Sequence, residues 1–466
     1  MAPSPLPNKH LLLLASLFLW ELSITVMLMA IYMKGDRPFA VFLSSNPGVV
    51  FLVTIAVSLI AGAVIIHQYL ASKRSPSSRF SLIVMMNLVT VILVLVTVEI
   101  AIRISSRSSG YDETLGSTVL MPKNWEKVAL YYRALPDQAS GDLPYQVYDD
   151  LMGWTNGPNR RSADGLYWSS SEGIRAPHTG VTFAKLAGRP RIALVGDSFT
   201  FGQEVTYEDT WGYLLEKALG SEFQVLNFGV SAYGIDQAFL RYEKDVRRWN
   251  PKIVIFGFIS HDVIRTMNVY PFINFGWVTP FSKPRFILRD GDLKRMNVPP
   301  LTPEAIFSRG SISELPFLEY EFGYKQSDWQ NSLYHLSYLA RLFVSKFPRW
   351  SVVNPDISDE AFVSVNASIL KAFVRSAAQT GAIPIVVYFP HGTELARPSS
   401  LHPLSKRVLQ EANIAYTDLT PCLLELNAAD RVVPPGRHYS PQVNATVANC
   451  LRDVVNEALA VPIFGG

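Results

Sequence analysis

The chain has 466 residues, of which 48 % are hydrophobic and 17 % charged, and its formal net charge is +3. This length allows a membrane unit together with one large or two modest domains. Basic and acidic residues are interspersed, so no basic stripe indicates a nucleic-acid partner. The sequence contains neither a pair of Cys-x-x-Cys motifs nor a histidine-rich cluster, so we expect no metal site and no cofactor.

Three apolar stretches occupy the first hundred residues, at 11–33, 49–69 and 80–102. Each is long enough, at about 20 residues, to cross a hydrocarbon core as a helix. The first is too long for the apolar region of a signal peptide, and no small-residue cleavage site follows it. Three buried helices of a water-soluble protein are the alternative. We predict a unit of three transmembrane helices over residues 1–104.

The basic residues near these stretches predict the orientation. The link between the second and third stretches carries Lys73, Arg74 and Arg79 and no acidic residue, which favours a cytoplasmic location. Arg103 and Arg107 favour the opposite orientation. On balance we expect a multi-pass protein of a bacterial inner or plasma membrane, with a cytoplasmic amino terminus. The large carboxyl-terminal domain is then extracytoplasmic.

Two acidic residues of the apolar stretches need partners. Glu21 lies near the middle of the first stretch, where a carboxylate costs about 2.5 kcal/mol or more. It is either protonated, paired with a polar group such as Asn87, or directed at an integral membrane partner protein. Glu99 and Arg103 are four residues apart and can pair along one helix face. The expected partners are therefore the lipid bilayer and other membrane proteins.

The remaining chain is predicted as a polar linker at 105–144 and an α/β domain at 145–466. Strands alternate with helices in this domain, which indicates a parallel sheet with right-handed crossovers. An aromatic-rich insertion at about 268–356 interrupts the alternation. The predicted strands are 191–195, 224–228, 253–258, 383–389 and 415–419, and the helices are 210–219, 237–249, 359–380, 400–412 and 443–459.

A serine follows directly on the first of these strands, in Gly196-Asp197-Ser198. Parallel strands present such residues at the carboxyl edge of the sheet. Serine is a poor nucleophile without a base, and His438, just before the last helix, is the candidate. An ordinary turn after a strand is the simpler interpretation of the same residues.

Ser198 in its Gly-Asp-Ser motif, with His438 near the end, resembles the SGNH (GDSL-type) hydrolase family over roughly residues 145–460. The resemblance implies a flavodoxin-like three-layer sandwich with a central parallel sheet. It also implies acyl transfer by a Ser-His pair, usually assisted by an aspartate.

The same resemblance assigns an oxyanion hole and exposes two departures from the family pattern. Its donors map onto Ser198, Gly229 and His261, the last standing where the family has asparagine. The usual aspartate position, three residues before His438, is Pro435. Asp430, eight residues upstream of the histidine, is the possible orienter. We leave His391, a single loop histidine, outside the predicted site.

The two cysteines, Cys422 and Cys450, bracket His438 in sequence. If the domain is exported, a disulfide between them is plausible and would fix the histidine loop. Two buried free thiols are the alternative.

Two functions remain open from the sequence. The first is a membrane-anchored esterase or O-acyltransferase that acts on acyl esters, such as O-acetyl groups, of cell-envelope glycans. The second is a catalytically degenerate subunit that keeps the fold and serves as a structural or assembly component of a membrane complex.

Overall fold

The computed structural model describes residues 76–134, 144–183, 188–275, 280–330, 336–346, 358–396, 403–431 and 437–460. It divides the chain into two units. One comprises residues 1–131 and 325–351, and the other comprises 132–324 and 352–466. Each is described by itself.

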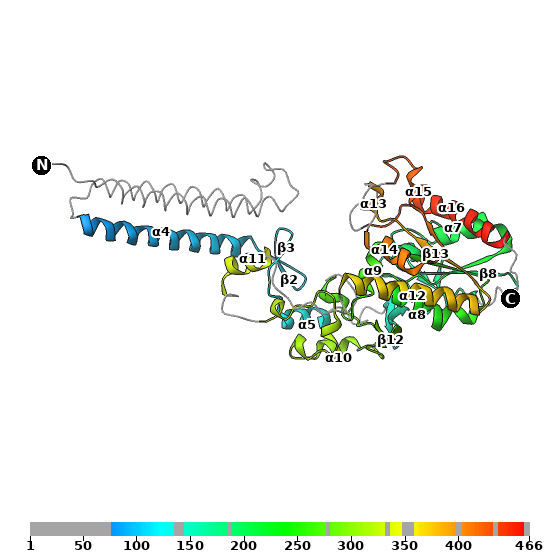
Figure 1. Cartoon of the computed structure of the whole chain (residues 1–466), viewed down its shortest axis with the longest axis horizontal. Coiled ribbons are helices and arrows are strands. Elements are labelled where there is room, and N and C mark those ends of the chain that lie inside the picture. Colours follow the sequence, from blue (N-terminus) through cyan, green and yellow to red (C-terminus); the bar gives the residue numbers. More distant parts are fainter. Residues whose placement is uncertain are drawn as a thin grey trace. The chain divides into compact units, whose positions relative to one another are not determined.

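The second unit is built on a five-stranded parallel sheet (Figure 1). Its strand order is β14-β13-β10-β8-β9, which is the order of flavodoxin-like doubly wound sheets. All six residues of β10 are buried, as expected for a strand covered on both faces. The α/β prediction is therefore confirmed. The strands are β8 (Arg191–Val195), β9 (Gln224–Asn227), β10 (Ile253–Phe258), β13 (Ile383–Tyr388) and β14 (Tyr416–Asp418).

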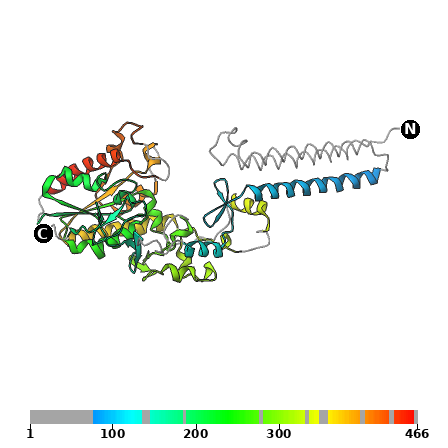
Figure 2. The ribbon, with the colours of Figure 1, turned by 180° about the vertical axis from the view of Figure 1, so that it is seen from behind.

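Two helical layers cover this sheet, as Figures 1 and 2 show from opposite sides. The helices of one layer are α7 (Trp211–Ala218), α15 (Thr420–Leu424) and α16 (Pro441–Ala460). The helices of the other are α8 (Ile235–Arg241), α9 (Ser260–Arg265), α12 (Asp359–Gln379) and α14 (Pro403–Ala412). The helix predicted over 237–249 is not uniform, because a π-helical turn, Tyr242–Val246, and a 3-10 turn, Arg247–Trp249, follow α8.

The first part of the insertion belongs to the same unit. It contains the hairpin β11 (Arg285–Arg289) and β12 (Asp292–Met296) and the short helix α10 (Pro303–Phe307). Lys283 anchors it through a buried ion pair with Asp236 of α8 and a hydrogen bond of 3.1 Å to the carbonyl of Asn268. Two short hairpins precede the sheet: β4 (Gln146–Asp149) with β5 (Gly153–Asn156), and β6 (Trp168–Ser169) with β7 (Arg175–Ala176).

The described part of the predicted linker, residues 105–134, contains regular secondary structure. A three-stranded antiparallel sheet turns at Gly110 and Gly116, both with positive φ, and the helix α5 follows it. These small elements were missed because their strands are too short to show an alternating pattern. The elements are α4 (Pro76–Ser105), β1 (Arg107–Ser109), β2 (Asp112–Leu115), β3 (Thr118–Val119), α5 (Trp125–Ala134) and α11 (Tyr338–Lys346).

The first two apolar stretches, with Glu21, lie outside the described residues. The third falls in α4, where Glu99 pairs with Arg103 at 2.9 Å as expected. Glu99 also accepts hydrogen bonds from the backbone N–H groups of Tyr338 and Leu339 at the start of α11. None of the helices in the described part of the chain is both long and apolar enough to span a membrane, so the predicted three-helix membrane unit is not supported here.

Candidate active site

Gly196 allows β8 to deliver Ser198 to the edge of the sheet. Its φ is 156°, and a Cβ atom there would lie 2.4 Å from the carbonyl oxygen of Gly257 on β10. Asp197 caps the one-turn helix α6 (Ser198–Phe201), since its Oδ1 accepts from the N–H of Phe199 at 2.9 Å. Ser198 is therefore the first residue of a helical turn at the point where the strand order reverses, the usual ligand-binding place of such sheets.

The structure brings Ser198 and His438 together. The Nε2 atom of His438 lies 2.8 Å from Ser198 Oγ, across a sequence separation of 240 residues. His438 stands in the loop before α16, which Tyr439 anchors by donating from its hydroxyl to the carbonyl of Pro390 at 2.6 Å. Ser198 is only 3 % exposed. The nucleophile and base expected from the sequence thus have the geometry of a Ser-His pair.

Glu204, which the sequence analysis did not select, occupies the third position of the site. Its Oε1 lies 3.5 Å from His438 Nδ1, and its Oε2 accepts from the His438 backbone N–H at 3.2 Å. Nδ1 is buried and makes no hydrogen bond within the described residues, so the contact with Glu204 is electrostatic here; such contacts often tighten only when substrate is bound. Asp430, the predicted orienter, instead accepts from the side chain of Asn427 at 3.3 Å. Pro435 lies outside the described residues.

Two opposing influences set the charge of the catalytic imidazole. Burial lowers the pKa of His438 below its ordinary value, and the nearby carboxylates of Asp197 and Glu204 partly offset this effect. The ring is then neutral near pH 7, as a general base must be. A carboxylate facing Nδ1 favours the tautomer that leaves Nε2 free to accept the serine proton.

A half-buried cation, Arg265, bridges two carboxylates behind the serine. Arg265 contacts Asp197 at 3.3 Å and Asp262 at 2.7 Å. Burial and the charge of Asp197 raise the pKa of Asp262. Ser198 Oγ lies 3.4 Å from Asp197 Oδ2. Since Asp197 also caps α6, its charge braces the serine turn.

The expected oxyanion donors are only partly in place. The N–H of Gly229 donates to Asn227 Oδ1 at 2.9 Å, so it is already engaged. Ser198 is the first residue of α6, where an N–H has no partner within the helix. Ala232, three residues beyond Gly229, has a φ of 67°, and its N–H makes no hydrogen bond within the described residues. Ala232 is thus a further candidate, because its N–H is not already engaged as that of Gly229 is, and no sequence signal indicated its left-handed backbone.

Two further histidines lie beside the catalytic one. His261 is exposed, and its ring packs edge-on against His391 with a centroid distance of 5.0 Å. Phe199 contacts the rings of both His391 and His438. His391 therefore borders the site from which the sequence analysis left it out. Within the described ranges, no group of three or more histidine, cysteine or carboxylate side chains is placed to hold a metal ion.

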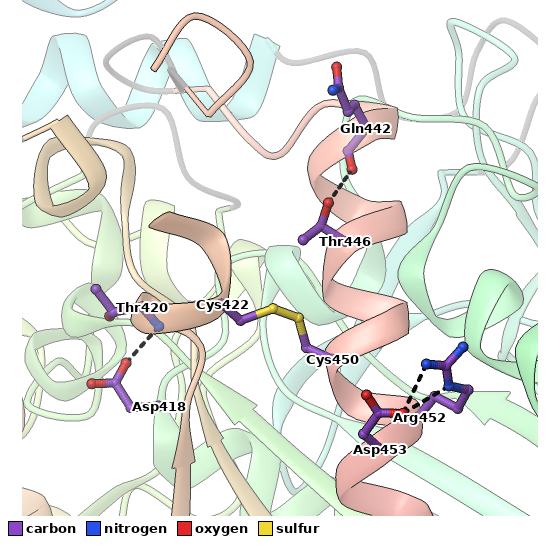
Figure 3. The surroundings of a disulfide bond; sticks show 8 residues. All are labelled: Asp418, Thr420, Cys422, Gln442, Thr446, Cys450, Arg452 and Asp453. Atoms are coloured by element: carbon purple, nitrogen blue, oxygen red, sulfur yellow. Dashed lines mark hydrogen bonds and ion pairs between the residues drawn. A yellow bond between two sulfur atoms is a disulfide. The ribbon is translucent and has the colours of Figure 1, made fainter. Parts of the chain in front are cut away.

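Cys422 and Cys450 form the disulfide that the sequence suggested (Figure 3). Cys422 lies on α15 and Cys450 on α16, and their Cα atoms are 6.6 Å apart. The bond fastens the last helix, which follows the His438 loop, to the helix after β14.

Neither a protein-family model nor a curated relative matches this chain. Similar solved structures include an acetyl xylan esterase (12 % identity, TM-score 0.31). A lipase/acylhydrolase from Enterococcus faecalis and a carbohydrate acetylesterase family member from Sinorhizobium meliloti each share 13 % identity at a TM-score of 0.29. The match to the acetyl xylan esterase covers 57 % of this chain and 99 % of that one. The match to the lipase/acylhydrolase covers 57 % and 96 %, and the match to the carbohydrate acetylesterase family member covers 58 % and 100 %. At such TM-scores the likeness carries no argument about function, which has to be argued from the site.

Proposed function

We propose that this protein is a serine esterase or acyltransferase that uses Ser198, His438 and Glu204. The observation that carries the proposal is the 2.8 Å contact between Ser198 Oγ and His438 Nε2, with the Glu204 carboxylate 3.5 Å from the other ring nitrogen, Nδ1. A nucleophile held by a base, and a base oriented by a carboxylate, is the arrangement required for acyl transfer.

In the proposed reaction, Ser198 Oγ attacks the ester carbonyl carbon while its proton passes to His438 Nε2. Glu204 stabilises the imidazolium, and the N–H groups of Ser198 and Ala232 hold the negative oxygen. The intermediate collapses, and the alcohol leaves with the proton from Nε2. Water or a sugar hydroxyl then attacks the acyl-serine by the same proton path, which releases the acyl group and restores the serine hydroxyl.

The substrate class and the location extend this proposal. We infer that the esters are acyl groups on cell-envelope glycans and that the first hundred residues hold the enzyme at the outer face of a membrane. The support is the three apolar stretches of the sequence and a set of exposed apolar side chains on α4. These residues are Met85, Leu88, Val89, Ile92, Leu95, Val96, Ile100 and Ile104.

Specific observations favour a second candidate, a degenerate subunit of a membrane assembly. Ser198 is nearly buried, and the N–H of Gly229 is bonded within the protein. A scaffold that lost its substrate opening would show both features. It would not need a carboxylate at Nδ1 of His438, and for that reason we prefer the enzyme.

The experiment is fluorophosphonate labelling of the purified full chain in detergent. We expect labelling of the wild-type protein and none of Ser198→Ala or His438→Ala, each checked for folding by circular dichroism. Absence of labelling in folded wild-type protein would favour the structural subunit, and the search would turn to proteins that purify with it.

A further inference from the structure

A large cavity lies beside the candidate active site in the second unit. Its volume is about 1050 Å³, at the upper end of the range of ligand pockets. It is lined by β4 and the residues just before it, by the end of α6 and the residue Gln203 that follows, and by α10 of the insertion. None of the proposed catalytic steps uses it.

One wall of the cavity is a cluster of three aromatic rings. Phe201 packs against Tyr145 and Tyr167 at centroid distances of 5.9 Å and 5.1 Å. The buried guanidinium of Arg175 lies over the rings of Tyr167 and Phe201, 4.8 Å from each centroid. Arg175 is itself held by the carbonyl of Val205 at 3.0 Å. The wall is therefore fixed before any ligand arrives, which lowers the entropic cost of binding.

The rest of the lining combines more rings with uncharged polar groups. Tyr132 and Phe307, stacked at 4.6 Å, and Tyr148 contribute rings. Among the described lining residues there is no leucine, isoleucine or methionine, the side chains that would suit an acyl chain. The charged residues in the described lining are one of each sign, Arg133 and Glu304. A ligand matched to this surface is neutral, with apolar faces for the rings and polar edges for hydroxyl and amide groups.

The cavity and the catalytic residues share structural elements. Phe201 ends the same helical turn that Ser198 begins. Tyr167 accepts a hydrogen bond at its hydroxyl from the N–H of Glu204, at 2.9 Å. Gln203, the neighbour of Glu204, accepts from the hydroxyl of Ser231, next to Ala232, at 2.5 Å. A ligand in the cavity thus contacts the elements that position the orienting carboxylate and the candidate oxyanion donor.

We propose that this cavity is a carbohydrate subsite that holds several sugar units of the substrate while the acyl ester reaches Ser198. Sugar rings have apolar faces that stack on aromatic rings and hydroxyl edges that bind amides, which is the chemistry of this lining. The inference rests on the proposed function for the ester at Ser198, but sugar binding can be measured without catalysis.

The test uses the full-length Ser198→Ala protein in a detergent without a sugar headgroup. Calorimetry measures the binding of xylotetraose, mannotetraose and chitotetraose. We expect at least one to bind, and Tyr148→Ala, which removes a half-buried ring, to weaken binding about tenfold or more. Glu304→Trp, which adds bulk at an exposed lining position, weakens it similarly. Tyr148→Phe, which keeps the ring, and Tyr416→Ala, an exposed tyrosine on β14 outside the cavity, retain the affinity.

Three outcomes would overturn the proposal. They are no binding of any oligosaccharide up to about 10 mM, binding that neither Tyr148→Ala nor Glu304→Trp weakens, and binding of decanoate in place of sugars. A separate assay, hydrolysis of p-nitrophenyl acetate by the wild-type protein, tests the proposed esterase activity independently of sugar binding. Hydrolysis without sugar binding removes only the subsite, whereas sugar binding without hydrolysis supports the subsite and removes the esterase.

Discussion

The carboxylate of Glu204 offers the sharpest test of the site, because Glu204→Gln removes its charge and keeps its size. Two unit charges 3.5 Å apart interact by about 5 kcal/mol at an effective dielectric constant of about 20. The Glu204 side chain is 29 % exposed and is also paired with Arg437 at 3.5 Å. Exposure to solvent and the pair with Arg437 both weaken the interaction. We therefore expect Glu204→Gln to remove about half of this energy from the stabilisation of the imidazolium in the transition state. A loss of ~2–3 kcal/mol corresponds to a decrease of about 30- to 150-fold in kcat/KM.

The assay is hydrolysis of p-nitrophenyl acetate over a range of pH, with Asp430→Asn as the matched control. Because Glu204 raises the pKa of His438, its removal shifts the acid limb of kcat/KM to lower pH. Asp430→Asn leaves both the rate and the limb unchanged, since Asp430 bonds to Asn427 instead. The reasoning fails if Glu204→Gln stays within about threefold of the wild type, or if Asp430→Asn loses as much activity.

Three further predictions follow from the same structure. In the wild type, burial lowers the pKa of His438, so the base stays neutral and kcat/KM persists to a pH below about 6.5; an acid limb above that value would contradict it. Replacing Cys422 and Cys450 by serine opens a 28-residue loop and lowers the free energy of unfolding in urea by about 3–4 kcal/mol; an unchanged midpoint would mean that the bond adds no stability. Asp236→Asn leaves the buried ammonium of Lys283 without its ion-pair partner and lowers the free energy of unfolding by about 3–5 kcal/mol in the same assay. The double variant Asp236→Leu, Lys283→Met removes both charges and recovers most of that stability; equal losses in the single and double variants would exclude the unpaired charge as the cause.

The sheet could be predicted from the sequence because its signals are local. Each strand is a short apolar run followed by a turn, as in β8 and the Gly196 turn, and each crossover helix has its own amphipathic pattern. The serine and histidine could be selected because the Gly196-Asp197-Ser198 motif directly after a strand, together with a histidine before the last helix, forms a recognisable sequence pattern. For the nucleophile and the base, the type of residue and its position next to a predicted strand or helix were therefore sufficient.

The orienting carboxylate could not be predicted in this way. Glu204 lies six residues after Ser198, far in sequence from His438, and reaches it only because its backbone adopts a φ of 70° after α6. Glutamate seldom adopts that conformation, so no propensity indicated it. The candidate oxyanion donor Ala232 was missed for the same reason, because its left-handed backbone depends on tertiary packing.

The 240 residues that separate Ser198 from His438 have a consequence for biosynthesis. The nucleophile emerges from the ribosome with β8, but its base arrives only with the loop before α16, after every strand of the sheet has been made. A partly synthesised or truncated chain therefore carries an unactivated serine and cannot attack esters on its way to its destination. Reactivity toward an acyl donor thus reports that the carboxyl-terminal helix has docked.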